Sequence, residues 1–169
     1  MLATLTYAYF SHPDWIFECK FDGERCLAYS DEKGVITLYS RNKKVLNNTY
    51  PELVEITSKP KYKSFIVDGE IVAIDKNGIS NFSKLQKRIQ LTYATKDVIT
   101  STPVYFYVFD IQYFDGHDVR MLPLFERKEF LKEVICFNSK VIWTEYHKEH
   151  GLEFYASAKQ WMQVVNASY

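Results

Sequence analysis

The chain has 169 residues, of which 47% are hydrophobic and 17% aromatic, a composition typical of an ordered globular protein rather than a disordered one. Its 21 basic and 21 acidic residues cancel, which argues against a protein whose only task is to coat nucleic acid. No apolar run approaches the ~20 residues needed to span a bilayer. The N-terminus lacks a signal-peptide pattern, and the three cysteines form no disulfide or metal-binding pattern. We therefore expect one cytoplasmic domain with no membrane partner.

The first half of the chain is predicted to consist mainly of strands separated by turns. The predicted strands cover residues 15–22, 25–30, 35–41 and 63–75, the last of them apolar enough to be buried. Gly23 interrupts the first two strands, and residues 31–34 have the composition of a hairpin turn. Residues 49–56 predict a short helix, with Thr49 as its cap and Pro51 in its first turn.

The second half of the chain shows mostly helical spacing. Three groups of apolar residues recur at this spacing: Phe82, Leu85, Ile89 and Tyr93; Leu124, Leu131, Val134 and Ile135; and Phe154, Ala158, Trp161 and Val165. Residues 104–111 predict another buried strand, which a turn at residues 114–118 ends, and Pro123 opens the second helix. The pattern predicts an α+β fold, with antiparallel-rich sheets and inserted helices, in a single domain over residues 1–169.

The segment KFDGER, residues 20–25, combines residue types that suit a phosphate ligand. A lysine within an apolar strand is costly unless it is paired, and desolvation lowers its pKa, which gives a more nucleophilic amine. Gly23 permits close backbone approach, and Arg25 offers a planar cationic fork for phosphate or carboxylate. The spacing alone is equally compatible with a surface hairpin that holds Lys20 and Arg25 in solvent.

The same segment resembles the KxDGxR signature of the covalent nucleotidyltransferases, which include ATP-dependent DNA ligases, RNA ligases and mRNA capping enzymes. Three further stretches resemble ligase motifs in the ligase order: YSRN with Arg41, FIVDGEIV with Glu70, and YFYVFDI with Phe109. The stretches MLA, DWIFE, YPEL and LPLFERK resemble the ligase domain of prokaryotic end-joining DNA ligases. These flanking stretches favour a DNA ligase over an RNA ligase or a capping enzyme.

The resemblance implies an ATP-dependent DNA ligase that uses Mg²⁺ and joins strands in repair or recombination. Lys20 is then the nucleophile that attacks the α-phosphate of ATP and carries AMP, which passes to the 5′-phosphate of nicked DNA before the strand is sealed. The other implied positions are Glu18 beside the adenine, Arg25 and Glu70 at the ribose, Glu70 also as a metal ligand, Phe109 stacked on the base, and Arg41 facing phosphate or the nick. Each has a purely structural alternative, such as a strand pair for Glu18, a turn-flanking acid for Glu70 or core packing for Phe109.

Two later family motifs, an acid–glycine pair and a lysine motif, have no match after the predicted helix at residues 151–159, and we expect the oligonucleotide-binding-fold domain to be absent. We therefore expect an incomplete nucleotidyltransferase (ATP-grasp-like) ligase adenylation domain with impaired activity. The expected partner is nicked or broken double-stranded DNA, with a complementary ligase chain or end-joining proteins as further candidates. The alternative is a non-catalytic ligase remnant, or half of a split ligase, that binds nucleotide, DNA or a partner chain.

Two weaker patterns remain. The run HKEH, residues 147–150, offers two imidazoles, but a third ligand is not evident, so a solvated loop is the better prediction. Lys84, Lys87 and Arg88 form a basic group on a predicted helix, which fits contact with a DNA backbone or an ordinary solvated face.

Overall fold

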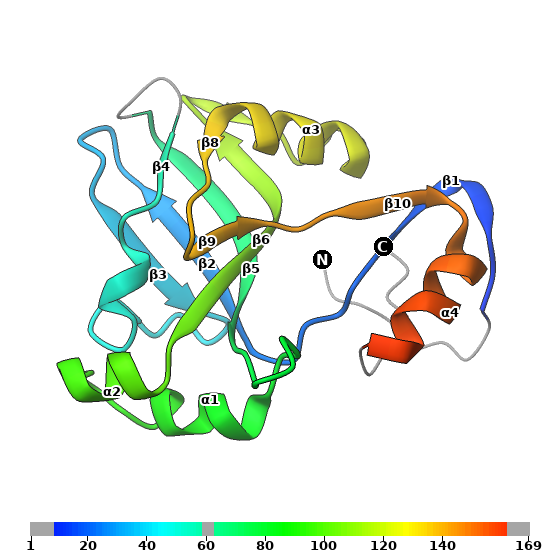
Figure 1. The fold of residues 1–169 in the computed structure, drawn as a ribbon. Coiled ribbons are helices and arrows are strands. Elements are labelled where there is room, and N and C mark those ends of the chain that lie inside the picture. Colours follow the sequence, from blue (N-terminus) through cyan, green and yellow to red (C-terminus); the bar gives the residue numbers. More distant parts are fainter. Residues whose placement is uncertain (1–8, 59–62, 162–169) are drawn as a thin grey trace. The chain divides into compact units, whose positions relative to one another are not determined.

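The chain forms two compact units in the computed structural model, which describes residues 9–58 and 63–161 (Figure 1). The central unit is Asp22–Trp143, and the terminal unit combines Met1–Phe21 with Thr144–Tyr169. Both are described below, each by itself. Antiparallel pairing dominates the strands, with helices inserted between them, so the predicted α+β class is confirmed. The assignment of residues 1–169 to one domain stays a prediction.

The described part of the central unit is built on a six-stranded sheet. Its strands are β2 (Glu24–Ser30), β3 (Ile36–Ser40), β5 (Phe65–Ala73), β6 (Val104–Phe114), β7 (His117–Asp118) and β9 (Val141–Trp143). They run in the order β3-β2-β5-β6-β7 with antiparallel pairing, and β9 adds to β6 in parallel. A separate antiparallel pair joins β4 (Thr57–Ser58) to β8 (Ile135–Cys136).

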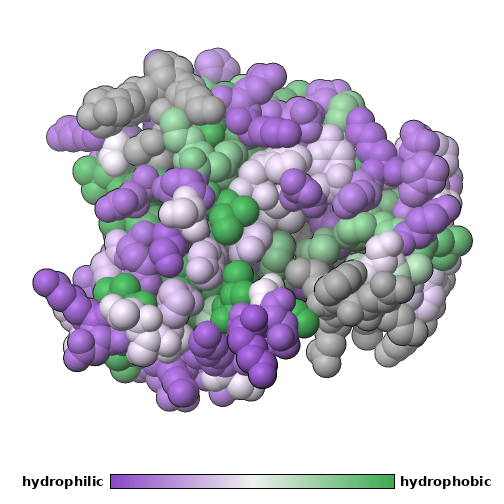
Figure 2. All heavy atoms as spheres, in the orientation of Figure 1, coloured by the Kyte–Doolittle hydropathy of each residue, from purple (hydrophilic) through white to green (hydrophobic). Residues whose placement is uncertain are grey.

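One face of this sheet forms the hydrophobic core. The largest apolar contributors with almost no exposed surface are Tyr50, Phe65, Phe106, Leu38, Leu46, Leu53, Ile56, Ile71, Leu85 and Ile111. Around the sheet are η1 (Pro51–Leu53), α1 (Phe82–Ile89), α2 (Lys96–Ser101) and α3 (Leu124–Val134). Figure 1 shows α1 and α2 at the lower end of the sheet and α3 at its upper end. Hydrophilic side chains cover the outer surface over α3 in Figure 2, in keeping with its exposed Glu126, Glu129, Lys132 and Glu133.

The turn between β2 and β3 confirms the prediction for residues 31–34. The Asp31 carboxylate accepts hydrogen bonds from the backbone amides of Lys33 (2.9 Å) and Val35 (2.8 Å). Gly34 has a φ of 79°, in the left-handed region where a side chain is disfavoured. An aspartate followed by a left-handed glycine is therefore the local cause of the hairpin.

Strand β6 contains two β-bulges against β5. Asp68 pairs with Asp110 and Gly69 with Val108, so β6 has one residue more than β5 over this stretch, and that residue is Phe109. A second register shift, farther along the same pair of strands, adds Gln112 in the same way. Bulges bend a strand and redirect its side chains, and they are frequent beside functional sites.

A buried arginine ties α1 to the segment around η1. Arg88 has 0% of its surface exposed, and its guanidinium donates to the Glu52 carboxylate at 2.8 and 3.0 Å. It also donates to the carbonyl oxygens of Thr49 (2.6 Å) and Thr102 (3.0 Å), and it lies over the Tyr50 ring. Such a buried ion pair is costly to break because the remaining charge would be left without compensation.

The prediction of a basic helix face is wrong for Arg88, which is buried in the pair just described. Lys84 is half-buried, and its ammonium donates to the Ile74 carbonyl at 2.8 Å. Lys87 remains exposed. The apolar face of this helix is also shorter than predicted, because α1 ends at Ile89, and Tyr93, beyond its end, is 69% exposed.

The helix predicted over residues 49–56 is a single 3₁₀ turn, η1, with Pro51 at its start. Tyr50, which precedes it, is fully buried, and its hydroxyl donates to the Glu24 carboxylate at 2.6 Å. Burial and this hydrogen bond raise the pKa of Tyr50. The bond fixes the start of β2, next to Arg25.

The described part of the terminal unit, residues 9–21 and 144–161, pairs β1 (His12–Glu18) antiparallel with β10 (Tyr146–Glu149), and α4 (Gly151–Trp161) follows. The Phe10 ring packs edge-on against Trp15 and Phe17. The HKEH run lies within and just after β10, where His147 stacks on Phe154 with ring centroids 4.2 Å apart, so the predicted loop is wrong, whereas the predicted exposure to solvent is confirmed for all four residues. Val165, predicted on the last helix, and the MLA stretch lie outside the described residues.

Several elements were not predicted: α2, β9 and β10 among them. Three strands are shorter than predicted: β1 ends at Glu18, β3 spans Ile36–Ser40, and β5 spans Phe65–Ala73. In the described ranges, each helix is too short or too polar to cross a membrane.

Candidate nucleotide-binding site

Three neighbouring strands of the central unit bring predicted site residues together. Arg25 on β2 is the register partner of Glu70 on β5, and Glu70 is in turn the partner of Tyr107 on β6. Because direct partners in an antiparallel pair project to the same side of a sheet, these side chains share one face. This is the face opposite to the one that carries Cys26, Ala28 and the core.

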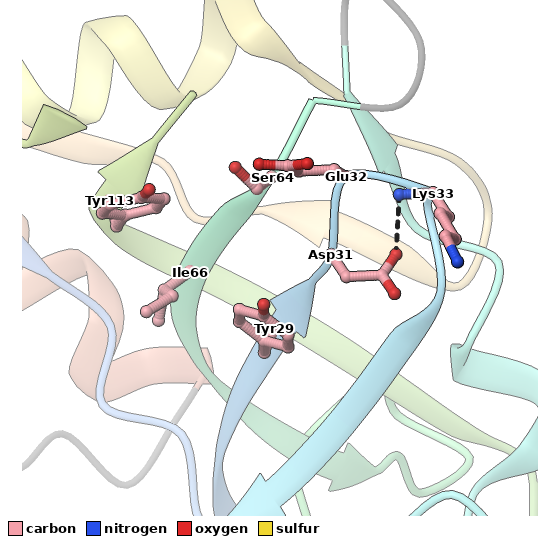
Figure 3. Close-up of a pocket in the computed structure, with 7 residues that line it drawn as sticks. All are labelled: Tyr29, Asp31, Glu32, Lys33, Ser64, Ile66 and Tyr113. Carbon is pink, nitrogen blue, oxygen red and sulfur yellow. Dashed lines mark hydrogen bonds between the residues drawn. The ribbon is translucent and has the colours of Figure 1, made fainter. Parts of the chain in front are cut away.

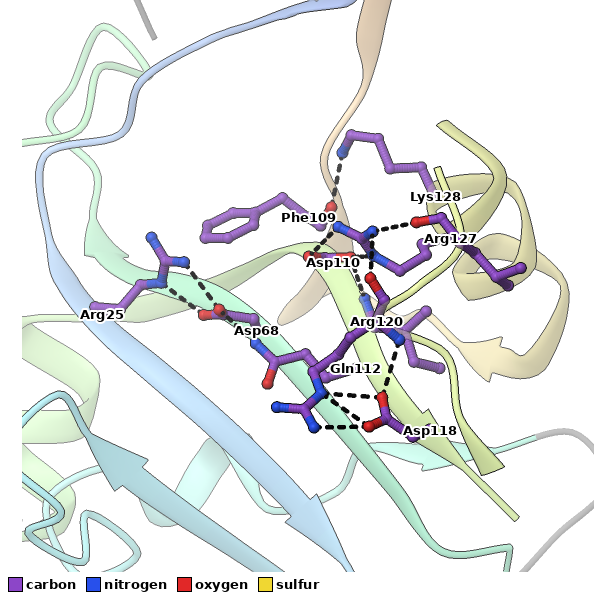
Figure 4. Close-up of polar contacts among 11 residues, drawn as sticks. Arg25, Asp68, Phe109, Asp110, Gln112, Asp118, Arg120, Arg127 and Lys128 are labelled. Atoms are coloured by element: carbon purple, nitrogen blue, oxygen red, sulfur yellow. Dashed lines mark hydrogen bonds and ion pairs between the residues drawn. The ribbon is translucent and has the colours of Figure 1, made fainter. Parts of the chain in front are cut away.

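Asp68 fixes the guanidinium of Arg25 on this face (Figure 4). Its two oxygens accept from Nε at 2.6 Å and from Nη2 at 2.8 Å, a bidentate pair. Gln112 adds a third hydrogen bond to Asp68, from Nε2 to Oδ2 at 3.1 Å. Asp68 is 4% exposed, whereas the Arg25 side chain is 28% exposed. The carboxylate therefore acts as a buried support, and the guanidinium remains accessible to a ligand.

Phe109 completes this group. The Arg25 guanidinium carbon lies 4.5 Å from the centroid of the Phe109 ring, within the range of a cation–π contact. Val104, Phe106 and Val108 face the core, so regular alternation directs Phe109 to the opposite face, and the bulge at Phe109 leaves Asp110, the register partner of Asp68, on that face as well. The structure thus brings Arg25, Glu70 and Phe109 together, and it makes ordinary core packing an incomplete account of Phe109.

Asp68 and Gln112 are site residues that the sequence analysis missed. Asp68 is the aspartate of the same FIVDGEIV stretch that contains Glu70, so a signal was present, but its pairing with Arg25 depends on the register of β2 and β5. Gln112 is the extra residue of the second bulge in β6, from which it donates to Asp68. No local sequence pattern predicts this bulge.

Glu18 and Lys20 belong to the terminal unit. Glu18 is the last residue of β1 and is buried, with Tyr146 as its register partner. Lys20 lies two residues beyond the strand and is exposed, so the prediction of a lysine within a buried strand is wrong. Cys19 lies between these two residues in the sequence. Its burial and the neighbouring Glu18 carboxylate raise the pKa of the Cys19 thiol. This keeps Cys19 protonated, so it is a poor competitor to an amine as nucleophile.

Arg41 lies in the turn that follows β3 and is exposed. This turn is closed by a hydrogen bond from the Lys43 amide to the Ser40 carbonyl at 2.8 Å, and Lys43 has a φ of 63°. In the sheet order, β3 is the strand at one edge, next to β2. Arg41 is therefore a surface cation. The family resemblance implied a position facing phosphate or the nick, and that role stays a prediction.

The carboxylates of this face set how a magnesium ion could be held. Asp68 pairs with Arg25 and Gln112, and Glu70, the second carboxylate of β5, lies on the same face of the sheet. Within residues 9–58 and 63–161, no three His, Cys, Asp or Glu side chains form a metal-ligating group. Mg²⁺ usually binds through one or two carboxylates together with substrate phosphates and water, and one glutamate fits that pattern.

A separate pocket of about 370 Å³ lies at the other end of β2 (Figure 3). Its floor is formed by Tyr29, Ile66 and Tyr113, which are register partners across β2, β5 and β6. The other lining residues are Asp31, Glu32, Lys33 and Ser64. No sequence pattern predicted this pocket, because the pocket arises from the strand register and the hairpin turn.

A family model described as the ATP dependent DNA ligase domain matches residues 1–166. The chain therefore belongs to the ATP-dependent DNA ligase domain family. It is 38% identical over 126 residues to DNA ligase 2 of Methanosarcina mazei, a match that covers 73% of this chain and 22% of the relative. DNA ligase 3 of Schizosaccharomyces pombe is 35% identical over 126 residues, covering 71% of this chain and 16% of the relative.

Two solved structures share the fold. A mycobacterial DNA ligase D complexed with ATP and MES matches with a TM-score of 0.72 and 24% identity, over 94% of this chain and 49% of that one. The ligase domain of LigD from M. tuberculosis matches with a TM-score of 0.70, over 92% of this chain and 49% of that one. The chain thus spans about half of these structures and 22% of the first curated relative.

Proposed function

We propose that this chain supplies the nucleotide-binding and adenylate-forming part of a cytoplasmic ATP-dependent DNA ligase. In the proposed first step, Nζ of Lys20 forms a bond to the α-phosphorus of ATP. The bond from that phosphorus to the pyrophosphate oxygen breaks, the amine loses a proton to solvent, and AMP remains on the lysine. AMP then passes to the 5′-phosphate of nicked or broken double-stranded DNA in repair or recombination.

The central unit is proposed to hold the nucleotide. A phenyl ring and a fixed guanidinium 4.5 Å away can contact a purine base and its ribose at the same time. Phe109 would stack on the adenine, and Arg25 and Glu70 would bind the ribose. Glu18, a residue of the terminal unit, is proposed to contact the base because the family resemblance implies that role. Because Asp68 already orients the guanidinium, binding the ribose costs Arg25 little conformational entropy.

The negative charge of the ATP phosphates must be neutralised by cations, and we assign this role to Arg41 and Mg²⁺. Arg41, an exposed cation, is assigned to the phosphates or the nick, where electrostatic contact positions the substrate. Mg²⁺, held by Glu70 together with the phosphates of ATP, would neutralise charge during the displacement.

The observation that carries the proposal is the convergence of Arg25, Glu70 and Phe109 on adjacent strands of a chain that belongs to the ligase family. These residues lie in three separate motifs, up to 84 positions apart in the sequence. An accidental set of surface residues would have no reason to share one face of a sheet.

The test is to incubate the full chain with α-labelled ATP and Mg²⁺ and to separate the products by denaturing electrophoresis. We expect label on the wild-type chain and on Lys33→Ala, a control that removes an exposed lysine from the β2–β3 turn. Lys20→Ala should carry none. A folded chain that binds ATP but takes no label would instead favour the alternative of a non-catalytic remnant or half of a split ligase. A chain that binds no ATP would refute the adenylate-forming role and would leave only the form of the alternative in which the chain binds DNA or a partner chain.

A further inference from the structure

Helix α3 presents two consecutive buried cations to the bulge that carries Phe109. Lys128 is 0% exposed, and its Nζ donates to the carbonyl oxygen of Phe109 at 2.9 Å. Arg127 is also buried and makes a bidentate pair with Asp110, from Nε to Oδ1 at 2.7 Å and from Nη2 to Oδ2 at 2.9 Å. Figure 4 shows both side chains reaching from α3 to consecutive residues of β6. Burying a charge is expensive unless the charge is paired or hydrogen-bonded, and these contacts provide that compensation.

The two contacts act on the backbone that sets the direction of the Phe109 ring. A bulge takes the extra residue out of the regular ladder, so its peptide groups need other partners. Lys128 supplies one for the Phe109 carbonyl. The Asp110 carboxylate holds Arg127 and also accepts from the Ile111 amide at 2.9 Å, which fixes the residue after the bulge. On the partner strand β5, Gly69 pairs with Val108, the residue before the bulge. The two strands approach closely there, since an added Cβ on Gly69 would lie 2.6 Å from Cε2 of Phe106.

We propose that Lys128, with Arg127, is a positioning residue for nucleotide recognition: it locks the β6 bulge so that Phe109 is preset to receive the base. This inference rests on the proposed function, because it takes Phe109 as the base platform. Lys128 touches the backbone of Phe109, and its effect on the ligand is indirect. The LPLFERK stretch thereby gains a specific task, since Arg127 and Lys128 are its two cations.

The test is a double-mutant cycle on the full chain with two probes, ATP and inorganic tripolyphosphate, which has phosphates but no base. Dissociation constants are measured by calorimetry for the wild type, Lys128→Met, Phe109→Ala and the double variant. Lys132→Met is the matched control, since Lys132 lies on the same helix and contacts the Trp143 ring instead. Near-ultraviolet circular dichroism checks that each variant keeps its packing.

We expect Phe109→Ala to weaken ATP binding about tenfold or more, and Lys128→Met about three- to tenfold. The double variant should bind ATP like Phe109→Ala alone, because positioning a ring that is absent has no effect. Tripolyphosphate affinity should stay unchanged in every variant, whereas general damage to the fold would lower it. Lys128→Gln, which keeps an N–H donor, takes the place of Lys128→Met if the latter does not fold.

The outcomes separate the two claims. If Phe109→Ala weakens ATP binding but Lys128→Met does not, or if the two effects simply add, the positioning role is refuted and the base platform stands. An equal loss of tripolyphosphate and ATP affinity in Lys128→Met also refutes it. If Phe109→Ala leaves ATP affinity unchanged, the base platform itself is refuted, and this inference with it.

Discussion

Arg25 illustrates how the role of one side chain depends on a residue that is distant in sequence. Its motif indicates a cation for a nucleotide, but the direction of its guanidinium is set by Asp68, 43 positions away, and by Gln112 beyond it. The cationic role of Arg25 could be predicted from the sequence. Its hydrogen bonds to Asp68, and those of Asp68 to Gln112, could not be predicted, because strand register is a property of the assembled sheet.

Replacing Asp68 by Asn should weaken ATP binding by about 1 kcal/mol, close to fivefold, because the amide no longer forms a charge-assisted bidentate pair with Arg25. The partly exposed guanidinium lowers this figure below that of a buried pair. Calorimetric titration with ATP measures the change, and Asp97→Asn on the exposed surface of α2 is the control. Unchanged affinity in Asp68→Asn would show that a preset guanidinium is not needed.

Tyr50 should give the chain a specific loss of stability at alkaline pH. Burial and the bond to Glu24 raise its pKa in the folded state above the unfolded value of about 10. The stabilisation is therefore complete below about pH 10 and is lost as the pH rises from there toward the folded pKa. Tyr50→Phe should cost about 1–3 kcal/mol at pH 7, and the difference from wild type should shrink at about pH 11.

Urea unfolding of both proteins at the two pH values measures this difference. The other tyrosines ionise in both proteins and cancel in the comparison. A gap between wild type and Tyr50→Phe that stays the same at pH 7 and at about pH 11 would rule out the proposed linkage.

At the scale of elements, β6 shows what periodicity reveals and what it hides. Val104, Phe106 and Val108 alternate toward the core, and then Ile111 follows after three residues instead of two. The change in spacing between buried residues marks the bulge. It could not be recognised from the sequence, because the aromatic residues between the buried positions are apolar as well. The parallel strand β9 was harder to predict, since three residues carry too short a pattern.

Gly69→Ala tests whether the bulge requires a glycine on the partner strand. The added methyl group would collide with the Tyr107 carbonyl oxygen and with Cε2 of Phe106, so β5 and β6 would have to separate. We expect a loss of ~1–3 kcal/mol in the free energy of unfolding. Thermal unfolding measures it, with Ser83→Ala on the exposed side of α1 expected to stay within about 0.5 kcal/mol. A Gly69→Ala protein as stable as the wild type would contradict the tight approach of the two strands.

At the scale of the whole molecule, the sequence motifs identified the family and the α+β class, and both are confirmed. The order of the motifs made this possible, since four short stretches in sequence constrain a family far more than any one of them. The division into two compact units was not predicted, because β1 pairs with β10, some 130 residues later, and neither strand has a strong local signal. The motif lysine and its proposed partners in the sheet consequently lie in different units.

The most direct measurement of the central claim is peptide mapping by mass spectrometry of the full chain after incubation with ATP and Mg²⁺. We predict one adenylyl group, located on the peptide that contains Lys20, and its removal when pyrophosphate is added, because the phosphoramidate step is reversible. Phe109→Ala should lower the fraction of chain that is modified at limiting ATP. An adduct on another lysine, or a folded chain that binds ATP and stays unmodified, would contradict the assignment of Lys20 as the nucleophile.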